Sequence, residues 1–149
     1  MKQKLVILGG GESGVGAAIL GQQKGYDVFV SDYGAIKDTY AQVLSSNQIN
    51  WEDRGHTVSE IIAADIVVKS PGIADVAPIV CSLKQAGVRV ISEIEFAAQF
   101  TDATIVAITG SNGKTSTASL TYALLKDELQ VALGGNIGDS FAAQVAAQD

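Results

Sequence analysis

The stretch Lys4-Leu-Val-Ile-Leu-Gly-Gly-Gly-Glu-Ser-Gly14 joins a short apolar run to a glycine loop. The apolar, β-branched part is typical of a buried strand, and the helical pattern of residues 15–24 follows the loop and ends at Gly25. Three glycines of the loop fit G-x-G-x-x-G, namely Gly9, Gly11 and Gly14. Such glycines permit a tight turn and let the backbone approach a diphosphate. One match of this kind is a weak signal, so a turn that only lets the helix pack closely stays an alternative.

Strand and helix patterns alternate over the residues that follow. Strands are predicted at residues 26–31, 49–54, 65–69 and 88–91, and helices at 37–46, 58–63, 77–86 and 93–100. This alternation predicts an α/β fold with an open, mostly parallel sheet and right-handed crossovers. We expect residues 1–98 to form a Rossmann-like domain. After a polar break at residues 101–104, residues 99–149 would begin a second domain.

A second glycine loop, Gly110-Ser-Asn-Gly-Lys-Thr-Ser116, follows an apolar run at residues 103–108 that is predicted as a strand. A helical pattern continues over residues 117–126. Strand, loop ending in Gly-Lys-Thr and helix is the layout of a P-loop. Its backbone N–H groups and helix N-terminus would surround a polyphosphate, with the Lys114 charge near the β- and γ-phosphates. The Thr115 hydroxyl would ligate Mg²⁺, so the loop predicts ATP and Mg²⁺ as cofactors.

Other strand ends carry polar residues. Asp32 lies 18 residues after Gly14 at the end of the second strand, where a carboxylate can accept a bond from a ribose or a base. Ser70 and Gly72 follow another strand and would face the same ligand, unless the serine only caps a Pro-Gly turn. Asn136, in a glycine loop after a strand predicted at residues 130–133, offers an amide to a sugar or serves a left-handed turn.

Composition excludes several classes of protein. The 149 residues carry a net charge of −6, which argues against a nucleic-acid binder. No segment approaches the roughly 20 apolar residues that span a membrane. The lone Cys81 forms no intrachain disulfide, which fits a reducing cytoplasm. His56 and Glu93 are interpreted as locally bonded or solvated side chains without a chemical role.

Four segments together resemble the Mur ligase family, and within it the D-glutamate-adding branch. They are Gly9–Gly14, Ser70-Pro-Gly-Ile73, Ala107-Ile-Thr-Gly-Ser-Asn-Gly-Lys-Thr115 and Gly134-Gly-Asn-Ile-Gly138. The family loop usually reads Gly-Thr-Asn-Gly-Lys, so Ser111 departs from it conservatively, and Tyr33 stands where the family often has threonine. The resemblance implies a cytoplasmic three-domain enzyme of peptidoglycan precursor synthesis. It would join D-glutamate to UDP-N-acetylmuramoyl-L-alanine through an acyl phosphate made with ATP.

The resemblance also assigns residues to sites. The UDP-substrate site would comprise Gly11, Glu12, Ser13, Gly14, Asp32, Tyr33, Ser70, Gly72 and Asn136. The ATP site would comprise Gly110, Ser111, Asn112, Gly113, Lys114, Thr115 and Ser116, with Lys114 and Thr115 as the catalytic residues and Thr115 as the metal ligand. The family's remaining machinery lies later in its sequence, so we expect this chain alone to lack ligase activity. The alternatives are another Mur-type amide ligase, a non-catalytic nucleotide-binding module, and a nicotinamide-dependent oxidoreductase.

Overall fold

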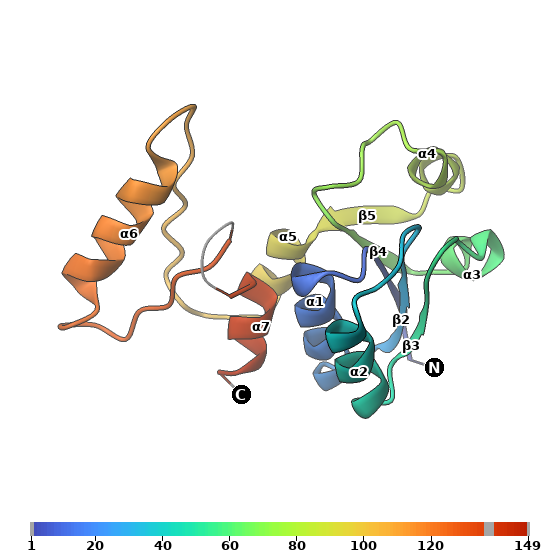
Figure 1. Ribbon diagram of the computed structural model, residues 1–149, viewed down its shortest axis with the longest axis horizontal. Helices are drawn as coiled ribbons and strands as arrows, with labels where there is room; N and C mark the ends of the chain where they lie inside the picture. The colour runs from blue at the N-terminus through green and yellow to red at the C-terminus, as the bar shows by residue number, and fades with distance from the viewer. Residues whose placement is uncertain (1, 136–138, 149) are drawn as a thin grey trace.

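The computed structural model describes residues 2–135 and 139–148 and contains one parallel sheet (Figure 1). Its strands are β1 (Lys4–Leu8), β2 (Asp27–Ser31), β3 (Asn50–Glu52), β4 (Ile66–Lys69) and β5 (Arg89–Ser92), in the order β3-β2-β1-β4-β5. All four pairings are parallel. The predicted α/β, Rossmann-like fold is therefore confirmed. The strand order reverses between β1 and β4, and in open sheets this switch point is where ligands bind.

Helices cover both faces of the sheet (Figure 1). They are α1 (Glu12–Gln23), α2 (Asp38–Ser46), α3 (Val58–Ile62), α4 (Pro78–Gln85), α5 (Glu93–Ala97) with a 3₁₀ turn (Ala98–Phe100), and α7 (Phe141–Ala146). A further helix, α6 (Lys114–Leu125), does not lie on the sheet. Because side chains alternate along a strand, β1 serves two cores. Leu5 and Ile7 join the core under α1, α2, α5 and α7, whereas Val6 and Leu8 join the core under α3 and α4. The apolar run that predicted β1 is thus buried on both faces.

The last helix packs against the first. Gly16 of α1 has no side chain at the contact, and a Cβ atom there would lie 2.2 Å from Ser140 Oγ and 2.9 Å from the Ala143 nitrogen. On the α7 side, Ala142 and Val145 are buried in the same core as Leu5. Helix α7, near the end of the chain, therefore covers part of the core formed by β1 and α1. The division into residues 1–98 and 99–149 stays a prediction.

Two predicted strands are absent. Residues 103–108 and 130–133 lie outside the five-stranded sheet, and in the described part of the chain no strand pairs with them. A strand exists through hydrogen bonds to a neighbour, whereas a helix makes its bonds internally. Helix α6 accordingly forms without support: none of its residues is buried, and it stands apart from the sheet (Figure 1). In the described ranges, no helix is long and apolar enough to cross a membrane.

Candidate nucleotide-binding site

The first glycine loop connects β1 to α1 with little space to spare. Gly9 adopts a φ of 102°, a left-handed value that favours glycine, and its N–H donates to the Ser31 carbonyl at 2.9 Å. A Cβ atom on Gly14 would lie 1.9 Å from the Gly9 carbonyl oxygen, so α1 packs directly on the loop. A Cβ on Gly11, by contrast, would meet nothing within 4 Å. Gly11 therefore borders open space, where a ligand can approach the backbone.

Helix α1 begins at Glu12, three residues earlier than predicted. Its N-cap is Gly11, and no side chain caps the first turn. Glu12 and Ser13, which the sequence placed in the loop, belong to that turn. The first N–H groups of a helix have no internal partner, so an uncapped N-terminus suits a phosphate group. The Glu12 carboxylate brings a negative charge to the same turn, and this charge would repel a diphosphate. The groups in this turn that suit a diphosphate are therefore the backbone N–H donors.

Asp32 holds the glycine loop in place. Its Oδ2 accepts a hydrogen bond from the Gly10 N–H at 2.6 Å, and its Oδ1 accepts one from the Gly34 N–H at 2.8 Å. The acid predicted to contact uridine thus already joins the loop after β1 to the turn after β2. Each carboxylate oxygen keeps a further lone pair for a ligand. The next residue, Tyr33, extends its side chain into solvent, with 79% of it exposed.

The turn after β4 touches the glycine loop. The Ser70 N–H donates to the Leu8 carbonyl at 2.9 Å, and a Cβ on Gly9 would lie 2.8 Å from the Ser70 Cβ. Lys69, which sequence reasoning missed, braces this turn: its Nζ donates to the Ile73 carbonyl at 2.6 Å and lies 3.3 Å from Asp75 Oδ1. Its one signal in the sequence is a cation at the end of an apolar strand. The loops predicted to share a ligand are therefore neighbours.

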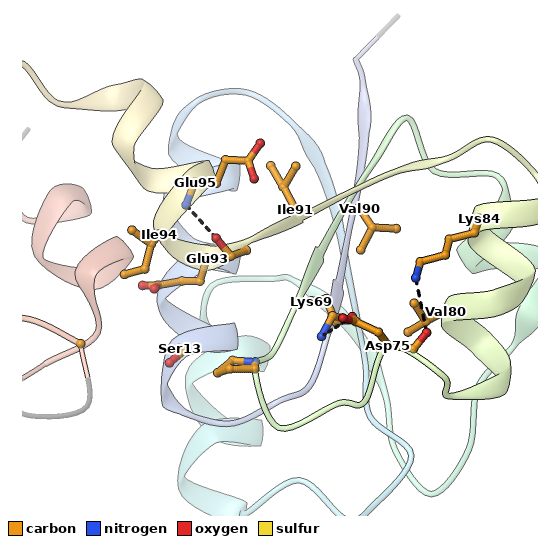
Figure 2. Close-up of a pocket in the computed structure, with 13 residues that line it drawn as sticks. Ser13, Lys69, Asp75, Val80, Lys84, Val90, Ile91, Glu93, Ile94 and Glu95 are labelled. Atoms are coloured by element: carbon orange, nitrogen blue, oxygen red, sulfur yellow. Dashed lines mark hydrogen bonds and ion pairs between the residues drawn. The ribbon is translucent and has the colours of Figure 1, made fainter. Parts of the chain in front are cut away.

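A cavity of about 570 Å³ lies beyond the ends of β4 and β5 (Figure 2). The figure shows Lys69 and Asp75 on one side of it and Glu93 on the other. Among the described residues predicted to bind the UDP substrate, Ser13 is the one that lines it. The cavity adjoins the turn after β4, and it does not include Asp32 or Tyr33.

Glu93 lines this cavity and is buried, so its interpretation as a solvated residue was wrong. Its side chain is 7% exposed, and its Oε1 accepts the Ala142 N–H at 2.5 Å. Burial raises the pKa of Glu93, and the hydrogen bonds from the Ala142 N–H and the Ser140 hydroxyl only partly offset this. The carboxyl group thus ties the start of α5 to the start of α7, a contact that no local pattern in the sequence indicates.

The second glycine loop has the backbone of a phosphate site. Gly110 and Gly113 adopt left-handed φ values of 146° and 76°, and Gly113 is the N-cap of α6 without a side-chain cap. The Lys114 ammonium donates to the Gly110 carbonyl and would have to leave it to reach a phosphate. Residues 111–116 are all exposed. An uncapped helix N-terminus beside a lysine fits a polyphosphate.

The predicted metal ligand, Thr115, stays a prediction. No group of three or more metal-binding His, Cys, Asp or Glu side chains gathers anywhere in residues 2–135 and 139–148. Thr115 would offer Mg²⁺ one hydroxyl ligand. Asn136 lies outside the described residues, and the second loop lies away from the sheet that carries the first (Figure 1). The structure thus brings together the glycine loop, Asp32, Tyr33 and the Ser70 turn, and leaves the phosphate loop separate.

Several curated proteins similar to this chain share one name. UDP-N-acetylmuramoylalanine--D-glutamate ligase of Bacteroides thetaiotaomicron is 55% identical over 97% of this chain, and that of Christiangramia forsetii is 54% identical over 98%. The chain spans about a third of the length of these relatives, 33% in both cases. Their similarity therefore covers both glycine loops but not a whole enzyme.

Solved structures of related ligases share the fold. A pseudomurein peptide ligase type C from Methanothermus fervidus matches with a TM-score of 0.59 at 27% identity, over 88% of this chain and 29% of that one. A UDP-N-acetylmuramate:L-alanyl-gamma-D-glutamyl-meso-diaminopimelate ligase from Neisseria meningitides gives a TM-score of 0.62 over 94% of this chain and 46% of its own, and at 20% identity it shows the fold alone. The family model described as the MurD N-terminal domain matches residues 4–79, about half of the chain. By that match this chain belongs to the MurD N-terminal domain family within the peptidoglycan Mur ligases.

Proposed function

We propose that this chain provides the UDP-substrate site and the start of the ATP site of an ATP-dependent ligase. The ligase would join D-glutamate to UDP-N-acetylmuramoyl-L-alanine during cytoplasmic peptidoglycan precursor synthesis. One observation carries this proposal: the Gly9–Gly14 loop, Asp32 and the Ser70 turn meet at the switch point of the sheet. The shared name of relatives at 54–55% identity supports the choice of substrate.

Each segment has a part in the proposed reaction. The uncapped N-terminus of α1, with Gly11 to Gly14, would hold the substrate diphosphate, while Asp32, Tyr33, Ser70 and Gly72 would surround the nucleoside end and Asn136 the sugar. Gly110 to Ser116 would hold ATP, with Lys114 placed to offset phosphate charge. Mg²⁺, held in part by Thr115, would neutralise the phosphates. The alanyl carboxylate of the substrate attacks the γ-phosphate, ADP leaves, and the amine of D-glutamate then displaces phosphate to form the amide.

The chain alone would bind but not catalyse. Residues 99–149 would be the start of the ATP-binding domain, and in the described residues their phosphate loop has no supporting strand. This separation is also what favours the alternative of a nucleotide-binding module without catalysis. Another Mur-type amide ligase would share the loops, and the relatives' common name argues for D-glutamate as the added amino acid.

Calorimetric titration of the purified chain tests the proposal. We expect UDP and UDP-N-acetylmuramoyl-L-alanine to bind and NADH not to bind. Binding of NADH without UDP would instead indicate the oxidoreductase reading. A second assay adds ATP, Mg²⁺ and D-glutamate and measures phosphate release, where we expect no turnover by this chain; measurable amide formation would contradict its assignment as an incomplete enzyme.

A further inference from the structure

Three polar side chains meet at the ends of β2 and β3, beside Asp32. Ser31, fully buried, donates its hydroxyl proton to Glu52 Oε1 at 2.6 Å, and His56 Nδ1 lies 2.7 Å from the same Ser31 oxygen. The Glu52 carboxylate also accepts from Thr57, at 2.7 Å from its N–H and 2.6 Å from its hydroxyl. The function proposed above uses none of these residues.

Counting the protons in these hydrogen bonds shows which nitrogen of the His56 ring donates to Ser31. Partial burial by itself would raise the pKa of Glu52, but the hydrogen bonds from Ser31 and Thr57, with the nearby His56, together lower it. The carboxyl group is therefore an ionised acceptor without a proton of its own. The one hydroxyl proton of Ser31 lies in its hydrogen bond to Glu52, so the Ser31 oxygen accepts a hydrogen bond from the Nδ1–H of His56. This leaves His56 Nε2 as the ring atom available to a ligand.

The loop that carries His56 is fastened to the turn that carries Asp32 and Tyr33. Three hydrogen bonds join them: Arg54 N–H to the Gly34 carbonyl at 2.9 Å, Gly55 N–H to the Asp32 carbonyl at 3.3 Å, and Ile36 N–H to Asp53 Oδ2 at 3.2 Å. Arg54 has a φ of 59°, a conformation that costs a residue with a side chain. A strained loop held this firmly keeps a histidine in a set position, as binding sites require.

We infer that His56, which lies next to Tyr33, recognises the base of the bound nucleotide. Tyr33 would stack on the base, and His56 would form a hydrogen bond with its edge. This deepens the proposed function and rests on it. The Tyr33 ring centroid lies 5.8 Å from that of His56, and its exposed face offers a stacking surface for a planar base. His56 Nε2 contributes the directional contact. A uracil edge, with one N–H between two carbonyls, can pair with Nε2 whether that nitrogen accepts or donates. An adenine edge also offers a donor beside an acceptor, but the two-ring purine places them farther from the ribose.

Because His56 is the single histidine of the chain, imidazole ¹⁵N spectra report on it without ambiguity. In the free chain we expect Nδ1 to carry a proton. On adding UDP we expect the Nε2 resonance to move while Nδ1 stays bonded to Ser31, and ADP at the same concentration should leave Nε2 in place. If UDP binds by calorimetry and the Nε2 resonance does not move, the inference is overturned while the proposed function stands. If UDP does not bind at all, both fail.

Variants give a second measurement. We expect His56→Ala to weaken UDP binding about tenfold, the loss of one good hydrogen bond, and His56→Gln to restore part of it. Ser59→Ala, an exposed position in the following helix, is the matched control and should bind as the parent chain does. Thermal unfolding of each variant separates folding from binding. Equal UDP affinity of folded His56→Ala and the parent chain would refute the assignment.

Discussion

The two glycine loops of this chain share a local plan and differ in their surroundings. Both precede helices whose N-caps, Gly11 and Gly113, carry no side-chain cap. The first follows β1, which is hydrogen-bonded to β2 and β4 and buried on both faces. The second follows residues 103–108, which form no strand and leave Val106 65% exposed. A local sequence can thus set a turn and start a helix, while the strand beneath it depends on neighbours.

Hydrogen exchange should show the largest contrast between the two regions. Amides of β1 exchange only when the sheet opens, whereas amides of residues 104–108 lie in no strand and exchange without unfolding. We expect protection to differ by a factor of at least about 10³. Amides of α6 serve as the internal control and should fall between the two, because they are hydrogen-bonded but not covered. Equal protection at residues 5–8 and 104–108 would remove the distinction.

Replacing one glycine of each loop with alanine should change the free energy of unfolding by amounts that differ by several kcal/mol. Gly14→Ala places a Cβ 1.9 Å from the Gly9 carbonyl oxygen, so α1 must move away from β1. We expect a loss of about 3 kcal/mol in the free energy of unfolding, measured with urea. Gly113→Ala meets no atom within 4 Å and strains only its own φ, so the sheet should keep its unfolding midpoint. Gly11→Ala is the control within the first loop and should cost under about 1 kcal/mol.

A substitution at the contact between α1 and α7 should reduce the free energy of unfolding by a smaller amount. In Gly16→Ala the new Cβ would collide with Ser140 and Ala143, which lie at the start of α7. We expect a loss of about 1–3 kcal/mol and faster exchange of the amides in α7, with β1 still protected. Gln23→Ala, exposed on the same helix, is the comparison variant. Undiminished protection of α7 in Gly16→Ala would show that the helix does not depend on this contact.

The smallest effects concern pH, and two glutamates should act in opposite directions. Burial raises the pKa of Glu93, so its folded form holds a proton that the unfolded chain, at an ordinary value of 4.5, releases. Stability from Glu93 is present below that value and falls as pH rises through the raised pKa. Glu52 has a lowered pKa, so its contribution is present above 4.5 and is lost as pH falls through the lowered value.

Urea unfolding from pH 3.5 to 7 measures both contributions. In the parent chain, we expect the free energy of unfolding to decline toward both ends of this pH range. Glu93→Gln should remove the decline as pH rises, and Glu52→Gln should remove the decline as pH falls. Identical pH profiles for the two variants would contradict the assigned environments. In the phosphate loop, Lys114 contacts a backbone carbonyl and not a carboxylate.

Much of the five-stranded parallel sheet could be predicted, because the sequence patterns that indicate its strands are local. The runs that became β1 and β2 are apolar and β-branched, and they end at glycine or aspartate, so strand type and approximate bounds were readable. Residues 103–108 are likewise apolar and partly β-branched and gave the same prediction, which was wrong for this chain. Apolar character describes a segment that suits a sheet, and hydrogen bonds to a partner strand decide whether it joins one.

Side chains that act across the fold were the hardest to predict. Glu93 and His56 each contact residues that are distant in sequence, and Lys69 contacts the turn that follows its own strand. None of the three belongs to a periodic pattern. His56 was interpreted as locally bonded or solvated, and its Nδ1 instead bonds to Ser31, 25 residues away in the sequence. Glu93 sits at a helix start, where a solvated carboxylate is common, and packing of α7 removed it from water.

The sequence by itself determined the parallel α/β unit, the positions of both glycine loops and the presence of a helix after each, because strand periodicity, glycine conformations and helix patterns act over a few residues. The tertiary structure decided which loops share a site. Asp32 reaches Gly10 and Ser70 reaches Gly9 because β1, β2 and β4 are neighbours in the sheet, and α7 buries Glu93 by packing on α1. Such contacts depend on distances between residues far apart in the chain, and only the folded chain sets those distances.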